Sequence, residues 1–444
     1  MITAVVDLTS AGQRLVDRIE NRTGRIGIVG LGYVGLPTAV AYADAGFSVV
    51  GIDTDRERAI AVARGESYIE DVRAADVRAA VDRGRLTTVT DLSAAGELDV
   101  VDICVHTPLG DTRVPDTSAI EAVGEALALQ QRDGQLIILT STSYPGTTEE
   151  ILRPILERSG LVIGRDFFLA FAPERIDPAN RSFTLRNTPK VVGGVDCAST
   201  EIAAKLLSTI VDVVVPVSDA TTAEMVKVLE NTFRMVNIGF ANEVAQICRR
   251  LGVDVWEVID SAATKPYGFM PFYPGPGVGG HCIPVDPSYL EWKLRNLEFR
   301  TRFIDLGNDV NRGMPDYVAR RATDILNEIG RSVRGSRILI IGVAYKPNIG
   351  DIRESPGVVI AEKLLHRGAA VRYADPHVAA LSVDSGVEIP RVDVNIAELE
   401  ASDLVVITTH HDSIDWDLVL ERAPLVLDTR GVRRGRGRSG WHTL

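Results

Sequence analysis

The sequence predicts an α/β protein with two Rossmann-like doubly wound domains, joined by a long central helix and a helical middle domain. Three observations predict it. Strand patterns alternate with helical patterns from residue 25 onward, as in a parallel sheet covered on both faces. Residues 220–251 contain no proline and no strand pattern. A second strand, turn, helix and strand series begins at residue 337. We therefore expect domains at 1–215, 216–330 and 331–444.

The composition excludes several classes of protein. The chain has 444 residues, of which 45% are hydrophobic, so it can bury several cores. Its net charge of -12 argues against nucleic acid or an anionic membrane as the main partner. No run reaches the 18 apolar residues of a membrane helix, and the opening residues are too polar for a signal peptide. Four widely separated cysteines fit a reducing cytoplasm, so we expect a cytoplasmic location.

The first domain opens with a dinucleotide-binding pattern. Residues 9–20 predict an amphipathic helix, and 26–29 a buried strand. Gly30, Gly32 and Gly35 then form G-x-G-x-x-G before a helix, and a strand at 48–52 ends at Asp53. Strand, glycine turn, helix, strand and acid are the full context of this fingerprint. The alternative is a glycine-rich turn in another doubly wound sheet.

The acid at the end of the second strand favours NAD as the cofactor. Asp53 would accept a hydrogen bond from the ribose 2′-hydroxyl and repel a 2′-phosphate. Arg58, one turn further on, would weaken that preference. We expect the cofactor to lie on the glycine turn and on residues that end later strands. The complete cofactor prediction is Gly30, Gly32, Tyr33, Val34, Gly35, Asp53, Arg58, Thr107, Thr142 and Arg353.

Later strands of this domain end in polar residues. Strand patterns at 98–109 and 136–139 end near His106 and in the run Thr140–Ser143. The carboxyl ends of strands are where open α/β sheets bind ligands. Helix capping near residues 146–148 is the structural alternative for some of these hydroxyls. Glu174 and Arg175 follow a further strand.

The long helix at 220–251 carries a polar pair. Lys227 and Asn231 are four residues apart and share a face. Such a pair on a buried helix is more often structural than catalytic, but its position between two α/β regions favours function. Leu229 and Phe233 are expected to contact the core or a partner helix.

Residues 275–286, Gly-Pro-Gly-Val-Gly-Gly-His-Cys-Ile-Pro-Val-Asp, predict a functional loop around Cys282. A cysteine beside a dinucleotide site suggests oxidation to a carboxylate through a thioester. Lys227 would lower the thiol pKa or stabilise an oxyanion. Asp286 or Glu174 would position or activate the hydrolytic water. An inert buried thiol is the alternative, and a metal site is disfavoured because His281 has no other ligand at suitable spacing.

The C-terminal domain repeats the pattern with a less complete turn. Gly342 follows a strand, the full glycine set is missing, and the next strand ends at Asp375. Lys346 and Arg353 lie in the turn, where a phosphate would bind. The basic tail, 433–444, is expected to be mobile. Two nucleotide-type sites suggest one for NAD and one for a nucleotide-linked substrate.

Six motifs resemble the UDP-glucose/GDP-mannose dehydrogenase family over nearly the whole chain, from Arg25 to about Gly431. They are GLGYVGLP (30–37), STSYPGTT (141–148), APER (172–175), AEMVKVLENT (223–232), GVGGHCIPVD (277–286) and GVAYKPNIGDIRESP (342–356). The resemblance implies that NAD oxidises a sugar primary alcohol twice to a uronic acid. It also implies a dimer built on the central helix, so we expect a homodimer or higher oligomer.

The resemblance assigns roles to the predicted site residues. Cys282 is the nucleophile, Lys227 and Asn231 stabilise the oxyanion, and Asp286, Thr142 and Glu174 handle water and protons. Lys346 would contact the substrate and Arg353 the cofactor region. The complete substrate prediction is Glu174, Arg175, Lys227, Asn231, Phe272, Tyr273, Gly277, Gly279 and Lys346.

The segments SYPGTTEE, PERIDP and FYPGPGVGGHCIPVDP are most similar to UDP-N-acetylglucosamine 6-dehydrogenases. UDP-N-acetylmannosamine and UDP-glucose 6-dehydrogenases are the alternatives. A two-electron hydroxyacid dehydrogenase, which needs no cysteine, is a second enzyme hypothesis. An inactive nucleotide-sugar sensor is the hypothesis of a different class.

Overall fold

The computed structural model describes residues 8–69, 71–110, 114–177, 180, 182–280, 282–383, 386–434 and 439–444, and for Cys282 the backbone alone. Its contacts divide the chain into two compact units. The first comprises Met1–Glu230 and Arg295–Leu297, and the second Asn231–Leu294 and Glu298–Leu444. The division into three domains remains a prediction, because the contacts place most of the helical middle segment in one unit with the C-terminal sheet.

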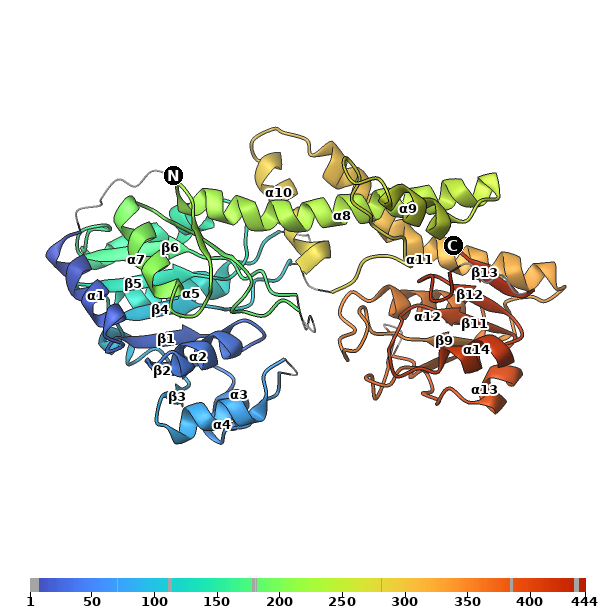
Figure 1. Cartoon of the computed structure of the whole chain (residues 1–444), viewed down its shortest axis with the longest axis horizontal. Coiled ribbons are helices and arrows are strands. Elements are labelled where there is room, and N and C mark those ends of the chain that lie inside the picture. The colour runs from blue at the N-terminus through green and yellow to red at the C-terminus, as the bar shows by residue number, and fades with distance from the viewer. Residues whose placement is uncertain are drawn as a thin grey trace. The chain divides into compact units, whose positions relative to one another are not determined.

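The first unit is built on one largely parallel sheet (Figure 1). Its strands are β1 (Arg25–Val29), β2 (Ser48–Ile52), β3 (Leu86–Val89), β4 (Val100–Ile103), β5 (Gln135–Leu139), β6 (Phe167–Phe171), β7 (Lys190–Gly194) and β8 (Val214–Pro216). Among the described residues their order is β3-β2-β1-β4-β5-β6-β7-β8, and the β6–β7 pair is antiparallel. The first six strands follow the 3-2-1-4-5-6 order of a dinucleotide-binding sheet. Ile28 pairs with Gly51 on β2 and with Asp102 on β4.

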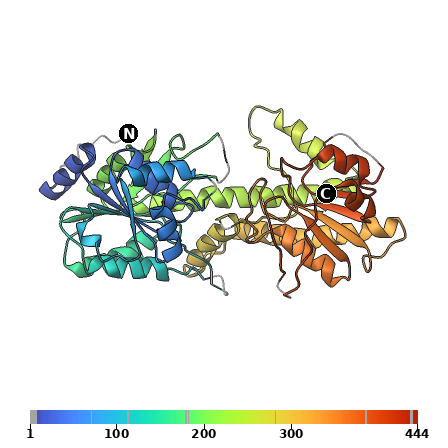
Figure 2. The ribbon, with the colours of Figure 1, turned by 90° about the horizontal axis from the view of Figure 1, so that it is seen from below.

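Helices cover both faces of this sheet (Figure 1 and Figure 2). They are α1 (Ser10–Glu20), α2 (Gly35–Asp44), α3 (Arg56–Ala63), α4 (Ala74–Asp82), α5 (Ser118–Ala128), α6 (Arg153–Leu156) and α7 (Cys197–Leu207), with short turns η1 (Ala95–Glu97), η2 (Thr148–Leu152) and η3 (Glu157–Ser159). Alternate strand residues enter different cores: Leu136 and Ile138 join one cluster, Ile137 and Leu139 the other. Because both faces are buried, the strands are continuously apolar.

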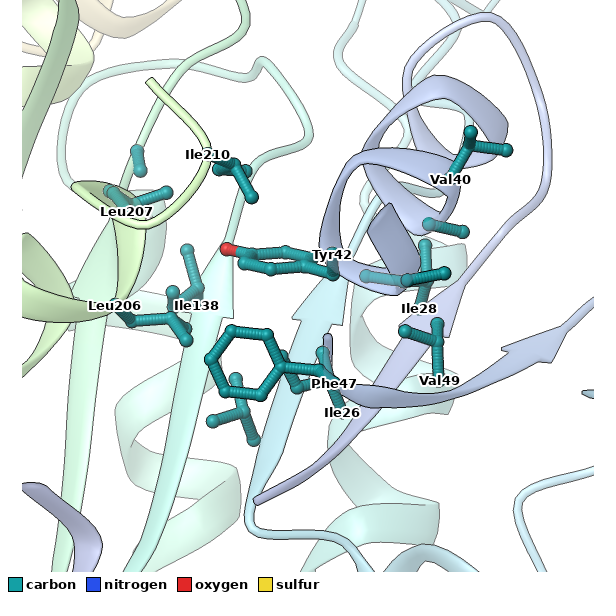
Figure 3. Packing of buried hydrophobic residues seen from close by; sticks show 14 of the residues in the cluster. Ile26, Ile28, Val40, Tyr42, Phe47, Val49, Ile138, Leu206, Leu207 and Ile210 are labelled. Carbon is teal, nitrogen blue, oxygen red and sulfur yellow. The ribbon is translucent and has the colours of Figure 1, made fainter. Parts of the chain in front are cut away.

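The core against α2 and α7 shows how tightly the first face is packed (Figure 3). Tyr42 and Phe47 meet edge to face, with ring centroids 6.0 Å apart. Ile26 and Ile28 of β1 and Ile138 of β5 surround them. Burial raises the pKa of Tyr42 well above its ordinary value, so its hydroxyl stays neutral.

The helix α8 (Ala220–Leu251) has the bounds that the sequence predicts. The helices that follow it are α9 (Val255–Ala263), α10 (Cys282–Arg295) and α11 (Arg302–Glu328). A Cβ at Gly239 of α8 would lie 3.1 Å from the Cα of Gly307 on α11, so two glycines allow these helices to cross closely.

The second sheet contains β9 (Arg337–Ile341), β10 (Ala370–Ala374), β11 (Leu404–Ile407), β12 (Val426–Asp428) and β13 (Trp441–Thr443). Its order, β10-β9-β11-β12-β13, is the other common doubly wound order, 2-1-3-4-5. One face packs on α11 and α12 (Pro356–His366), and the other on α13 (Ile396–Ala401) and α14 (Trp416–Arg422). The predicted doubly wound fold is therefore confirmed for both sheets.

Two local predictions were wrong. The expected loop 275–286 ends early, because α10 begins at Cys282 and continues through Asp286; proline is compatible with the first turn of a helix, which explains Pro284. The expected mobile tail includes β13, which pairs in parallel with β12, while its residues 435–438 lie outside the described part. No described helix has both the length and the apolar character needed to cross a membrane.

Candidate functional site

The glycine turn after β1 has the shape that a dinucleotide needs. Gly30 has φ +91°, and a Cβ there would lie 2.5 Å from the carbonyl oxygen of Cys104. A Cβ at Gly35 would lie 1.8 Å from the Gly30 oxygen, whereas a Cβ at Gly32 would meet nothing within 4 Å. The outer glycines are thus required by the fold, and Gly32 leaves an open surface for a pyrophosphate at the start of α2. Tyr33, 53% exposed, and the partly exposed Val34 lie beside that surface.

Asp53 is held at the end of β2 by this same turn. Its Oδ2 accepts from the Leu31 N–H at 2.8 Å and its Oδ1 from the Asp55 N–H at 2.9 Å. The Arg58 guanidinium is 4.0 Å from Oδ2. Each carboxylate oxygen has a second lone pair, so the carboxylate can still accept from a ribose hydroxyl. Tyr68 donates to the Leu31 carbonyl at 2.6 Å, and its burial raises its pKa to about 12.

The ends of β4 and β5 bring two predicted threonines together. Thr107 Oγ1 donates to the backbone oxygen of Thr142 at 2.6 Å. The neighbouring hydroxyls have structural partners: Thr140 donates to Asp102, and Ser141 to the carbonyl of Val105. Thr140 and Ser141 thus hydrogen-bond to the neighbouring strand region and do not cap a helix, and Thr142 keeps a partly exposed side chain at the expected ligand edge.

A buried glutamate that sequence reasoning missed fixes the following turn. Glu224 of α8 is 1% exposed. It accepts from the Gly146 N–H at 2.5 Å, the Thr148 N–H at 2.8 Å and Thr148 Oγ1 at 2.6 Å. Burial raises its pKa to about 7, while the three hydrogen bonds oppose the shift. The turn that follows Thr142 is therefore anchored to α8. The available sequence signal was an acidic residue three positions before Lys227 on the same helix.

Glu174 forms a buried ion pair with Lys190, a second residue that sequence reasoning missed. The Lys190 Nζ is 2.8 Å from Glu174 Oε2, and the side chains are 6% and 12% exposed. Glu174 Oε1 accepts from the N–H groups of Arg175 and Ile176 at 2.7 and 2.8 Å. Although burial opposes it, Lys190 and these donors lower the pKa of Glu174. Glu174 is thus a fixed carboxylate suited to orienting water, and a lysine opening a buried strand was its sequence signal.

Arg175 has identified hydrogen-bond partners in the protein, and Lys227 is a nearly buried residue of α8. Arg175 donates to Glu230 through its Nε and Nη2 atoms, and its Nη1 donates to the Pro189 carbonyl at 2.7 Å. Lys227, on α8, is 9% exposed. Arg175 is therefore positioned by the protein, as a recognition arginine or as a structural one.

Asn231 and Asp286 meet in the second unit. Asn231 Nδ2 donates to Asp286 Oδ2 at 2.5 Å, and the two residues are 5% and 2% exposed. Cys282 is the first residue of α10 and lies four positions before Asp286, which places the two on one face of the helix. A helix N-terminus favours the thiolate. The Cys282 side chain and His281 lie outside the described residues.

The glycines before α10 pack on the protein itself. A Cβ at Gly277, where φ is +134°, would lie 3.1 Å from Pro356, and one at Gly279 would lie 2.6 Å from Tyr345. The Gly280 N–H donates to the Arg353 carbonyl at 3.0 Å. Packing alone thus requires glycine at these positions, and substrate contact by Gly277 and Gly279 stays a prediction.

Phe272 and Tyr273 have different surroundings. The Phe272 ring meets Phe233 edge to face at 5.6 Å. Tyr273 stacks on Trp256 at 5.7 Å, donates to Asp260 at 2.7 Å and lies under the Arg434 guanidinium. The contacts with Trp256, Asp260 and Arg434 give Tyr273 a structural role within the protein.

The long turn after β9 carries Lys346 and Arg353. Arg353 forms a forked ion pair with Asp351, with Nη2 2.6 Å from Oδ2. Lys346 is partly exposed. At the strand end, Asp375 accepts from the N–H groups of Val343 and Ala344, both at 2.9 Å, and is 3.1 Å from His411 Nε2.

The described residues contain no cluster of three or more His, Cys, Asp or Glu side chains able to hold a metal ion.

Comparisons with known proteins agree with this geometry. Three family models match: the NAD binding domain of the UDP-glucose/GDP-mannose dehydrogenase family at residues 24–211, its central domain at 221–313 and its UDP binding domain at 339–434. A UDP-N-acetyl-D-mannosamine dehydrogenase of Methanococcus maripaludis is 34% identical over 92% of this chain and 93% of its own. An NDP-N-acetyl-D-galactosaminuronic acid dehydrogenase of Ralstonia nicotianae is 35% identical over 94% and 98%.

A solved structure shares the whole fold. The UDP-D-ManNAc dehydrogenase of Pyrococcus horikoshii superposes with a TM-score of 0.85 at 32% identity, over 94% of this chain and 98% of that one. The open surface at Gly32 fits the NAD that the first family model describes. The chain therefore belongs to the UDP-glucose/GDP-mannose dehydrogenase family of NAD-dependent enzymes.

Proposed function

We propose that this enzyme oxidises the C6 primary alcohol of a UDP-linked N-acetylhexosamine to the carboxylate, a four-electron oxidation through a thioester on Cys282. The observation that carries the proposal is the buried hydrogen bond between Asn231 and Asp286, one turn along α10 from Cys282. It holds a carboxylate on the face of the helix that begins with the thiol.

The Gly32 surface would hold NAD⁺, which would supply the hydride acceptor for both oxidations of the sugar. The chain supplies the rest. Cys282 adds to the C6 aldehyde, and the amide of Asn231 and the ammonium of Lys227 stabilise the oxyanion of the resulting thiohemiacetal. After the second oxidation, water attacks the thioester. Asp286 and Glu174 orient that water and Thr142 takes part in proton transfer, which leaves the acid and a free thiol.

The charge of Glu174 supports this division of roles. Its pKa is lowered although it is buried, because Lys190 and two backbone N–H groups hold the carboxylate. A carboxylate that stays ionised is a poor proton donor and a good acceptor for a water. Asp286, with Asn231 on one oxygen, is the second acceptor.

Two observations bear on the identity of the sugar, and they favour different epimers. The sequence segments favour UDP-N-acetylglucosamine, whereas relatives named for UDP-N-acetyl-D-mannosamine favour its epimer. Both sugars carry an acetamido group at C2, as does the product of the NDP-N-acetyl-D-galactosaminuronic acid enzymes. We propose UDP-N-acetylglucosamine as substrate and UDP-N-acetylmannosamine as the second candidate, both ahead of UDP-glucose.

A panel of UDP- and GDP-sugars tests the function. NADH absorbance and product mass give base, sugar and electron count together. We expect two NADH per sugar and an acid product with a UDP-N-acetylhexosamine. Full acid formation by Cys282→Ser would overturn the mechanism, and absence of NADH with every sugar would support a sensor.

We also infer a homodimer through α8. Phe233, Phe240, Ile247 and Leu251 are between 46% and 71% exposed. Their spacing of seven, seven and four residues places them on one stripe of the helix. A second copy of this helix would bury the stripe. Phe240→Asp should lower the mass measured by sedimentation from dimer to monomer, and an unchanged mass would contradict the inference.

A further inference from the structure

A basic pocket lies within the second unit, where the last turns of α8 face α11. This open pocket has a volume of about 290 Å³, and its charged lining consists of Arg249, Arg250, Arg320, Arg321, Arg367 and Asp324. Five arginines thus surround one cavity with a single carboxylate, in a chain whose net charge is -12. None of these residues belongs to the cofactor or substrate predictions.

One arginine of the pocket lining, Arg321, is buried without a hydrogen bond. The Arg321 side chain is 2% exposed. Within the described part of the chain, none of its Nε, Nη1 and Nη2 atoms has a hydrogen-bond partner. Its nearest carboxylate is Asp324, whose Oδ2 is 3.8 Å from Nη1 and whose side chain is 60% exposed. Since buried charges in proteins are normally paired and hydrogen-bonded, the Arg321 guanidinium lacks the partners that its burial requires.

The surrounding groups add positive charge and fix its geometry. Arg367 Nη1 donates to the Ala319 carbonyl at 2.7 Å and to Thr323 Oγ1 at 2.9 Å, which anchors its guanidinium beside the pocket. Burial, and then the positive charge of Arg249, lower the pKa of Arg321. Arg249 therefore repels Arg321, although Tyr317, Asp324 and Glu328 oppose the shift, and an anion in the pocket would relieve that repulsion.

We propose that this pocket binds a small phosphate-bearing anion, at a site separate from those for NAD and the nucleotide sugar. The guanidinium fork matches two phosphate oxygens at once, and a phosphate accepts from several donors without supplying any. The volume is at the lower end of small-molecule pockets, which suits a phosphate or diphosphate group better than a whole dinucleotide.

Calorimetric titration of the full chain with inorganic pyrophosphate, and separately with inorganic phosphate, tests the proposal. Saturating NAD⁺ and UDP are present throughout, because both occupy sites that would otherwise take the probe. We expect residual binding of at least one probe to the wild type, and at least tenfold weaker binding to Arg321→Met. The relative response to the two probes distinguishes a phosphate site from a diphosphate site.

Two further variants keep the test decisive. Arg302→Met changes an exposed arginine at the start of the same helix, about 28 Å along it from Arg321 at 1.5 Å per residue, and should bind like the wild type. Arg249→Gln with Arg250→Gln alters two exposed positions and should weaken binding severalfold even if Arg321→Met fails to fold. Absence of residual binding in the wild type, or equal binding by all variants, overturns the proposal. A change of oligomeric mass in Arg321→Met without probe binding would instead assign the pocket to a second copy.

Discussion

In the first sheet, Asp53 directly follows β2, and in the second, Asp375 directly follows β10. Asp53 accepts one backbone N–H on each oxygen and retains 8% exposure beside Arg58. Asp375 accepts from Val343 and Ala344, and from His377, and also faces His411, with its side chain fully buried. Asp53 can therefore still accept a hydrogen bond from a ribose. Asp375, at the corresponding position of the second sheet, is fully occupied by protein donors.

The turns that follow β1 and β9 also differ between the two sheets. Gly30 and Gly35 are five residues apart, whereas Gly342 and Gly357, which make equivalent close approaches, are fifteen apart. A Cβ at Gly342 would lie 2.6 Å from Thr409, and one at Gly357 2.9 Å from Thr408. The extra residues carry Lys346 and Arg353. The second half therefore presents side chains at its turn, where the first half presents bare backbone.

Gly35→Ala should have the largest effect on stability. Its Cβ would overlap the Gly30 oxygen at 1.8 Å, so we expect a loss of about 4 kcal/mol or more in unfolding free energy. Gly357→Ala, its counterpart, should lose about 2 kcal/mol because a threonine hydroxyl can shift. Urea titrations measure both. Gly32→Ala is the control: it should keep wild-type stability and bind NAD⁺ at least about tenfold more weakly. Wild-type stability of Gly35→Ala would contradict the larger steric cost that we expect at Gly35 than at Gly357.

Glu224 should make the first unit less stable as pH rises. Its pKa is about 7 in the folded chain and 4.5 as its ordinary value. The folded-state pKa is raised, so its contribution is complete below pH 4.5 and is lost as pH rises through 7. The loss is about 3 kcal/mol. Glu224→Gln should remove this dependence, and unfolding at pH 5 and 7.5 measures it. Parallel pH profiles for variant and wild type would refute the assignment.

Asp375 should respond to pH in the opposite direction. Burial opposes the shift, but His411 and the backbone donors lower its pKa to about 2 from 3.8. A lowered folded-state pKa contributes stability above pH 3.8 that is lost as pH falls through 2, about 2 kcal/mol in all. Asp375→Asn should therefore be less stable than wild type at pH 7, with the gap closing toward pH 2. A gap that stays constant on acidification would argue against the lowered pKa of Asp375.

The smallest expected effect compares the two acids directly. Asp53→Asn should raise the dissociation constant of NAD⁺ about threefold to tenfold, by weakening one charge-assisted hydrogen bond to the ribose. Asp375→Asn is the matched change in the other half and should leave NAD⁺ affinity unchanged. Fluorescence titration with NAD⁺ measures both. Equal losses would mean that the two acids do not have separate roles.

Sequence patterns predicted the architecture well because buried parallel strands and glycine turns leave strong local signals. The bounds of α8 and the turn at Gly30–Gly35 are examples. The partners of buried charges left no such signal: Lys190 meets Glu174 across sixteen residues, and Glu224 meets Gly146 across seventy-eight. The start of α10 at Cys282 was missed because Gly-Gly-His-Cys-Ile-Pro favours a loop locally. Contacts between residues that are distant in the sequence determine these features, and hydrophobic periodicity along the sequence does not reveal such contacts.

One measurement tests the central claim, that the first half holds NAD and the second holds the nucleotide of the substrate. NAD⁺ and UDP are titrated calorimetrically into two variants, Gly32→Val and Lys346→Ala. We predict that Gly32→Val loses NAD⁺ binding and keeps UDP binding, and that Lys346→Ala keeps NAD⁺ binding and loses most UDP affinity. Loss of both ligands in the same folded variant, or the reverse pairing, would contradict the account.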